Sequence, residues 1–225
     1  MEIQVRHNPS FAVARAILAP GEVARAEAGA MMATSGGVAI ESQARGGMMK
    51  SLKRSFLGGE SFFVTTFTAP DGGGWVDCAA RLPGDVVTLD ASHGLNLTQG
   101  SFLLSGGDVE IDTSWGGFKS MFGGEGGFML RATGTGPVAC ACYGALDQIE
   151  LGPGEQVVLD SGHLVAFTDG ITFTTRKVAK GWIQSATSGE GLVMEFTGPG
   201  HVWSQTRNPD EFVDWLTTVL PFTRE

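Results

Sequence analysis

A short pattern that recurs three times along the chain constrains its fold more than any other feature of the sequence. The copies read PGEVARAE from Pro20, PGDVVTLD from Pro83 and PGEQVVLD from Pro153. A second marker, GGE or SGE, recurs out of phase with the first, and its glutamates are each 65 positions apart: Glu60, Glu125 and Glu190. A fixed period of this size indicates that one supersecondary unit has been copied and stacked.

Short runs of β-branched and aromatic residues, bounded by Gly, Pro or Asp, predict β-strands. These runs are residues 62–68, 86–89, 138–142, 157–159, 171–175 and 192–196. Glycine is unusually frequent, at 34 of 225 residues, and clusters between the runs, which is typical of many turns. In each PG step, proline presets φ and glycine accepts a positive φ, so we expect a tight turn that the following acid caps or leaves solvated. The sequence predicts an all-β fold of three modules: residues 1–82, 83–152 and 153–207.

A C-terminal amphipathic helix and tail are predicted over residues 208–225. Asn208 suits the N-cap, Pro209 the first turn, and Asp210 and Glu211 complement the positive end of the helix dipole. One face of this helix carries four apolar residues at a spacing of three to four: Phe212, Trp215, Leu216 and Val219. We expect this face to dock on the β body or on a neighbouring subunit.

The charge and hydropathy of the chain favour a cytoplasmic protein. The net charge of −9 disfavours a nucleic-acid footprint, which needs clustered Lys and Arg. No apolar run approaches the ~20 residues that a membrane-spanning helix needs, and the N-terminal residues do not resemble a secretory signal. Three cysteines without a second pair fit a reducing compartment.

Two turns carry the pattern D-x-x-H, in Asp90 with His93 and in Asp160 with His163. A carboxylate beside an imidazole can orient a base or bind a divalent ion. The first copy of the repeat has no histidine there, and a catalytic metal needs three protein ligands where one turn offers two. We therefore expect these side chains to satisfy the local backbone, with no metal and no cofactor.

The cysteines and the glycine-rich stretches give no further catalytic motif. Cys140 and Cys142 share a face of one strand, with Cys78 as a counterpart in the preceding module. We expect all three to be small buried residues that pack between strands. Residues 115–127 are rich in glycine but lack the spacing of a phosphate-binding loop, and there is no G-x-S-x-G elbow.

Two glycine-flanked segments combine Met, Phe and Lys in an otherwise acidic protein: GGMMKSLKRSF from Gly46 and GGFKSMF from Gly116. A looser third version, KGWIQS, begins at Lys180. Such segments suit loops that meet a partner, a subunit or an anionic membrane, and the alternative is a strand pair with solvated lysines. The residues that we expect at this contact are Met48, Met49, Lys50, Leu52, Lys53, Arg54, Phe118, Lys119, Met121 and Phe122. In a ring, equivalent loops would face one side and multiply a weak contact by avidity.

These segments also carry a resemblance to a known family. The run GGMMKSLKRSFLGGESFFVTTFTAP, then PGDVVTLD, then GGFKSMFGGEGGF, resembles the altered-inheritance-of-mitochondria (AIM twenty-four) family of bacterial, archaeal and mitochondrial proteins. The resemblance covers roughly residues 2–220. It implies three modules per chain, each a short double-stranded β-helix similar to the trp RNA-binding attenuation protein, and association as a homotrimer. The family offers no catalytic motif and no established bacterial activity, and its mitochondrial relatives are linked to inner-membrane organisation.

Three hypotheses for function follow. The first is a non-enzymatic scaffold or binding protein, a homotrimeric ring that presents the Met/Phe/Lys loops to a protein partner or an anionic membrane surface. The second is a small-molecule or metal-dependent enzyme that uses the two D-x-x-H turns, since double-stranded β-helix folds often enclose ligands. The third is RNA binding, which predicts affinity that falls steeply with salt and which the acidic charge disfavours.

Overall fold

The computed structural model describes residues 1–42, 64–112, 129–177 and 192–221. In these ranges the chain is all-β apart from three short 3₁₀ turns and one α-helix, α4 (Pro209–Val219). The predicted strand runs are confirmed, with residues 62–63 outside the described part. The prediction of an all-β chain with a C-terminal helix is therefore confirmed.

The strands fall into three successive groups, which we call units I, II and III. Unit I follows β1 (Glu2–Arg6) and contains β2 (Val13–Leu18), β3 (Val23–Glu27), β4 (Met31–Thr34), β5 (Ala39–Ser42), β6 (Val64–Thr68) and β7 (Gly74–Ala79). Unit II contains β8 (Val86–Asp90), β9 (Leu95–Thr98), β10 (Phe102–Gly106), β11 (Val109–Asp112), β12 (Met129–Gly134) and β13 (Pro137–Ala141). Unit III contains β14 (Leu146–Leu151), β15 (Gln156–Asp160), β16 (Leu164–Thr168), β17 (Thr172–Lys177), β18 (Leu192–Thr197) and β19 (Gly200–Gln205).

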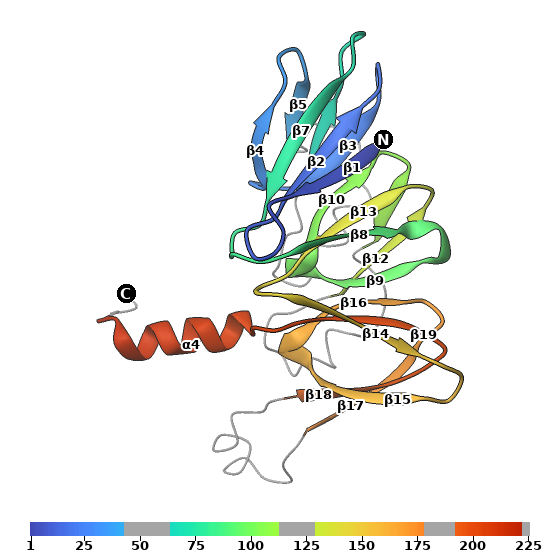
Figure 1. Cartoon of the computed structure of the whole chain (residues 1–225), viewed down its shortest axis with the longest axis vertical. Coiled ribbons are helices and arrows are strands. Elements are labelled where there is room, and N and C mark those ends of the chain that lie inside the picture. Colours follow the sequence, from blue (N-terminus) through green and yellow to red (C-terminus); the bar gives the residue numbers. More distant parts are fainter. Residues whose placement is uncertain (43–63, 113–128, 178–191, 222–225) are drawn as a thin grey trace.

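The same strand pairing occurs in each unit. The last strand lies between the first and the third, in the orders β2-β7-β4, β8-β13-β10 and β14-β19-β16. The other three strands form a second triplet, in the orders β5-β6-β3, β11-β12-β9 and β17-β18-β15. The second triplet of one unit continues into the first triplet of the next, because β3 pairs with β10 and β9 pairs with β16. The three units are therefore stacked along the long axis of the molecule (Figure 1).

Two of the three PG turns have the predicted geometry. They join the first strand to the second in units I and III, and Gly21 and Gly154 have φ of 69° and 78°. Each following acid caps its own turn, since Glu22 and Glu155 both accept a hydrogen bond at 2.8 Å from the backbone amide three residues earlier.

The Pro83 copy is not equivalent to the other two, and the tight turn with a positive φ that we expect at each PG step is not formed there. Pro83 lies between β7 and β8, outside the units. A Cβ on Gly84 would lie 1.8 Å from the carbonyl oxygen of Cys142, so this glycine permits a close approach of two backbone segments. Asp85 accepts a hydrogen bond from the amide of Ser10 at 3.0 Å instead of capping its own turn. Short matching sequence does not determine which strands pair.

The hydrophobic core runs across the unit boundaries. Ala26 of unit I lies opposite Leu104 of unit II, and Leu97 of unit II lies opposite Ala166 of unit III. All four side chains are at most 1% exposed. In unit III, Phe167 packs against Phe173 and Phe196, with ring centroids 5.4 and 5.3 Å away. The burial of each boundary residue therefore depends on the presence of the neighbouring unit.

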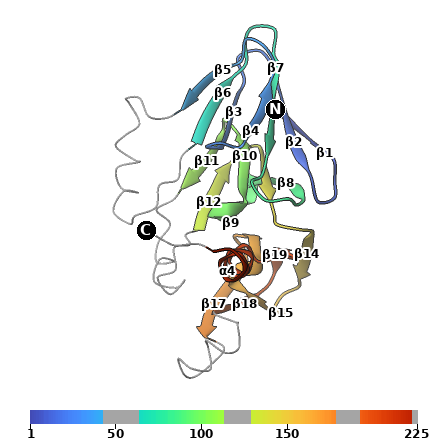
Figure 2. The same ribbon diagram turned by 90° about the vertical axis from the view of Figure 1, so that its left-hand side faces the viewer.

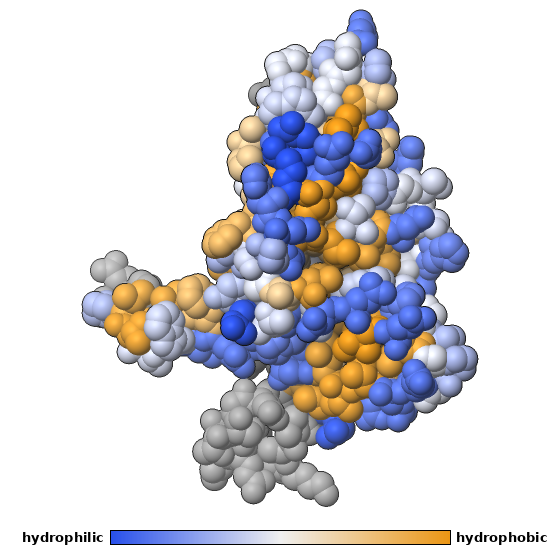
Figure 3. All heavy atoms as spheres, viewed as in Figure 1, coloured by the Kyte–Doolittle hydropathy of each residue, from blue (hydrophilic) through white to orange (hydrophobic). Residues whose placement is uncertain are grey.

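Helix α4 has the predicted cap but little contact with the other described residues. Asn208 accepts a hydrogen bond from the amide of Asp210 at 2.9 Å. No residue of the helix is buried, and Phe212 touches Tyr143 with ring centroids 5.7 Å apart. Figures 1 and 3 show the helix projecting from the body with apolar side chains on its surface.

Candidate functional site

The ten Met, Phe, Leu, Lys and Arg residues expected at a contact surface lie outside the described residues, in segments 43–63 and 113–128. These segments, with 178–191, each stand between the fourth and the fifth strand of a unit. Figure 2 shows the paired strands β5/β6 and β11/β12 on the same side of the molecule. The role of the ten residues stays a prediction.

The first D-x-x-H turn satisfies its own backbone. Asp90 accepts a hydrogen bond from the amide of Ser92 at 2.8 Å, and this bond lowers the pKa of the Asp90 carboxyl. His93 Nδ1 lies 2.9 Å from the hydroxyl of Ser92. The turn joins β8 to β9, the first two strands of unit II.

The second D-x-x-H turn has the same local form at a different place in its unit. Asp160 accepts from the amide of Gly162 at 2.8 Å, and His163 Nδ1 lies 2.7 Å from the carbonyl oxygen of Gln205. This turn joins β15 to β16, the second and third strands. Within the described ranges, no group of three His, Cys, Asp or Glu side chains is placed to hold a metal ion. The expectation that these turns satisfy the backbone is confirmed.

The three cysteines are buried and unpaired, as expected for packing residues. Burial raises the pKa of Cys78 and of Cys140 to about 12 and that of Cys142 to about 11. A thiol with so high a pKa carries almost no thiolate at neutral pH and is a poor nucleophile or metal ligand.

At each junction, a polar side chain of one unit donates hydrogen bonds to the following unit. At the first junction, Arg25 Nη1 donates to the carbonyl oxygens of Gly107 at 2.6 Å and Val109 at 3.1 Å. At the second, Asn96 stands in the equivalent register position and donates to Asp169 Oδ1 at 2.9 Å. Asn96 is 1% exposed, so its hydrogen bond to Asp169 favours this register, because a buried donor without a partner would cost free energy.

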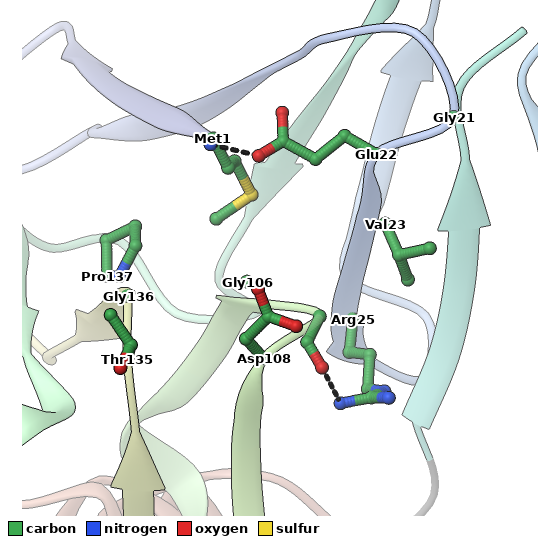
Figure 4. A pocket seen from close by; sticks show the side chains of 11 residues that line it. Met1, Gly21, Glu22, Val23, Arg25, Gly106, Asp108, Thr135, Gly136 and Pro137 are labelled. Atoms are coloured by element: carbon green, nitrogen blue, oxygen red, sulfur yellow. Dashed lines mark hydrogen bonds and ion pairs between the residues drawn. The ribbon is translucent and has the colours of Figure 1, made fainter.

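A groove of about 320 Å³ lies beside the first junction (Figure 4). It lies between the N-terminus and the turns around Gly106 and Gly136, and the Met1 ammonium pairs with the Glu22 carboxylate at its rim. Burial opposes ionisation of Glu22, but hydrogen bonds from Met1 and from a backbone amide lower its pKa overall. The lining residues include no His, Cys or Ser, so they contain no nucleophile–base pair of that kind.

Two strands of the described chain have an unpaired edge where their counterparts in the other units are paired on both sides. β4 has this edge at one end of the stack, and β15 has it at the other. The equivalent strands β3 and β9 each pair with the next unit, and β10 and β16 each pair with the preceding unit. Ala33 on β4 and Leu159 on β15 are half-buried, whereas the residues in the equivalent register positions are buried. An unpaired strand edge is a template for pairing with another chain.

The sheet that ends in β4 is held by a buried carboxylate. Asp77 on β7 is 2% exposed and accepts two hydrogen bonds from Arg15, at 2.7 and 2.8 Å, and one from Arg6 at 2.6 Å. Arg15 also stacks over the Trp75 ring at 4.0 Å. The Arg15 hydrogen bonds, together with the charges of Arg15 and Arg6, hold the pKa of Asp77 below its usual range despite burial.

We expect Asp77→Asn to lower the free energy of unfolding by about 2 to 3 kcal/mol, because it leaves two arginines without their shared counter-charge. The contribution of Asp77 is fully present above the unfolded-state pKa near 3.8 and is lost as the pH falls through the lower folded-state pKa. Urea denaturation between pH 7 and pH 3 measures both effects. The difference between wild type and variant should shrink below about pH 4, and a difference independent of pH would contradict the assignment.

The fold is that of an all-β protein with three stacked units, in which two six-stranded sheets each cross one unit boundary and the edges of β4 and β15 are left unpaired by the described strands. The chain belongs to the family described as Mitochondrial biogenesis AIM24, whose model matches residues 3–207. It is 30% identical over 179 residues to an uncharacterised protein of Streptococcus pyogenes serotype M6, covering 78% of this chain and 71% of the relative. A crystal structure of a Streptococcus pyogenes protein is similar in fold, with a TM-score of 0.82 at 24% identity over 97% of this chain and 99% of that one. Within the described residues, no helix has the length and apolarity to cross a membrane.

Proposed function

We propose that this chain is a non-enzymatic scaffold or binding protein that assembles into a ring of three copies. The ring presents the Gly-flanked Met/Phe/Lys loops to a protein partner or an anionic membrane surface, and we place it in the cytoplasm. The observation that carries the proposal is the pair of unpaired edges on β4 and β15, whose counterparts pair with each other twice within the chain.

The internal junctions define the register expected between copies. Ala26 faces Leu104, and Leu97 faces Ala166. The same register between β15 of one copy and β4 of the next places Leu159 opposite Ala33. It also places Val158, which is 49% exposed in the single chain, opposite Thr34. Pairing would complete both hydrogen-bond ladders and cover these side chains.

Because the unpaired edges lie at opposite ends of the stack, the contact is head-to-tail, and such contacts close into rings when the rotation allows. We propose that units I to III are the three short double-stranded β-helix modules that the family resemblance implies, similar to the trp RNA-binding attenuation protein. The strand pairing favours boundaries near residues 86 and 146. Three copies would then close the ring with three units each.

The two Met/Phe/Lys segments that we propose as the contact stand in units I and II, and the looser version from Lys180 stands at the same place in unit III. A ring of three copies would carry three copies of each loop, so a weak contact by one loop would be multiplied by avidity. Methionine and phenylalanine supply adaptable apolar contact, and the lysines and Arg54 supply attraction to anionic headgroups or acidic partners.

We expect the triple substitution Met48→Ser, Met49→Ser and Leu52→Ser to abolish binding to anionic vesicles while the fold is retained, because it removes the apolar contact of one loop type. Co-sedimentation with phosphatidylserine-containing vesicles measures binding, and circular dichroism checks the fold. The matched control replaces Ala39 and Ile40, which are exposed on β5 outside the loop and outside the proposed contacts between copies, with Ser. If wild type and the triple variant bind equally well, these residues are not the contact.

A further inference from the structure

We infer that helix α4 of one copy docks on a second copy of this chain, with its apolar face covering Phe11. This inference rests on the ring proposed above and adds a second element to the contact between copies. It is drawn from the segments outside the units, the exposure of two aromatic side chains, and the charges beside them.

Four segments outside the units lie side by side in chain order: residues 10–12, 80–85, 142–145 and 206–208. Backbone hydrogen bonds join each to the next: Ala12 N to Gly84 O at 3.0 Å, Asp85 N to Gly144 O at 3.0 Å, and Thr206 N to Ala145 O at 3.0 Å. This ladder follows the stacking of the units and ends with residues 10–12 on one side and 206–208 on the other. In a head-to-tail ring, residues 10–12 of the next copy occupy the following position of the ladder, beside residues 206–208.

Each end of the ladder carries exposed aromatic surface. Phe11, at one end, is 72% exposed. At the other end, α4 begins directly after residue 208, and its Trp215 and Val219 are 57% and 52% exposed. Phe212, one turn earlier, already touches Tyr143 on the preceding step of the ladder. The helix therefore lies next to the place that the second copy's Phe11 would occupy, with two large side chains still uncovered.

The charges at the two ends are complementary. The helix contains three acids, Asp210, Glu211 and Asp214, and no Lys or Arg. On the segment next to residues 10–12, Arg81 lies 3.5 Å from Glu27 and keeps 77% of its side chain exposed. When the apolar face of α4 covers Phe11 of a second copy, the acids of the helix come near the exposed guanidinium of Arg81 in that copy. This attraction favours the docking of α4 on Phe11.

The test cross-links two differently tagged chains that are co-expressed, one with Asn8→Cys near Phe11 and the other with Thr218→Cys on α4. The native cysteines are buried with raised pKa values, so a flexible bis-maleimide reacts with the introduced thiols. We expect a covalent pair of unlike chains on a denaturing gel. We expect Trp215→Ser to lower the yield of this product about tenfold, because truncating an aromatic side chain at the centre of an interface weakens binding by about this factor or more. Ala39→Cys, on the exposed strand β5, replaces Asn8→Cys in the control pair and should give no product.

Native mass spectrometry of the same samples separates the two proposals. A trimer mass with the specific cross-link supports the docking of α4 on the second copy. A trimer mass without the cross-link, or with equal cross-linking of the control pair, overturns the helix inference and leaves the ring in place. A single-chain mass without a cross-link overturns the ring, and the inference with it.

Discussion

Replacing Ala33 with Glu is expected to convert the assembled protein into single chains of 23.6 kDa. Ala33 stands on the unpaired edge of β4, in the register position that Leu104 and Ala166 occupy at the internal junctions, where both are at most 1% exposed. A carboxylate buried there would face Leu159 of the next copy without a partner. The cost of an unpaired buried charge, several kcal/mol, exceeds what one strand pairing contributes. In the single chain the same side chain can reach water, so the fold should persist.

Ala39→Glu is the matched control, because Ala39 is exposed on β5, a strand whose counterparts β11 and β17 are also unpaired on one side. It should keep the mass of the wild type. Size-exclusion chromatography with light scattering compares the two variants at equal concentration. An unchanged mass for Ala33→Glu would mean that β4 is not the contact, whatever the oligomeric state.

Phe167→Ala is expected to lower the free energy of unfolding by about 3 to 5 kcal/mol, the typical cost of removing a buried aromatic ring. Phe167 is 1% exposed and lies opposite Asn96 on β9, so its ring supports both the core of unit III and the junction with unit II. Its contacts with Phe173 and Phe196 add ring–ring attraction to the loss of buried area.

Guanidinium denaturation compares Ala33→Glu alone with the double variant Ala33→Glu, Phe167→Ala. In this background the chain stays single, so the free energy of unfolding does not depend on protein concentration as it would in an assembly. Val158→Ala is the control, since an exposed aliphatic side chain on the same unit should cost no more than about 0.5 kcal/mol. A loss below about 1 kcal/mol for Phe167→Ala would show that unit III does not depend on this cluster.

Local features of the fold could be predicted from the sequence because their causes are local. The strand runs, the capped helix at Asn208 and the turns at Gly21 and Gly154 follow from propensity, hydrogen-bonding capacity and permitted φ values. The 65-residue period indicated a repeat because copied units keep their spacing.

The relations between units could not be predicted in the same way. The Pro83 copy has the letters of a PG turn, but the contact with Cys142 that fixes Gly84 comes from a residue far along the chain. The unpaired edges of β4 and β15 likewise depend on β3 pairing with β10 and β9 with β16, which no single segment encodes. The exposure of Phe11 and Trp215 is also visible only in the folded chain. The predicted Met/Phe/Lys contact lies outside the described residues and rests on the sequence alone.

Native mass spectrometry of the unmodified chain tests the central claim most directly. Closed pairing of β15 with β4 predicts a single dominant species of about 71 kDa, three chains of 23.6 kDa, at micromolar concentration. A species of 23.6 kDa would contradict the ring, because both edges would then remain unpaired in solution. An open series of increasing masses would also contradict it, because the head-to-tail contact would then form without closing.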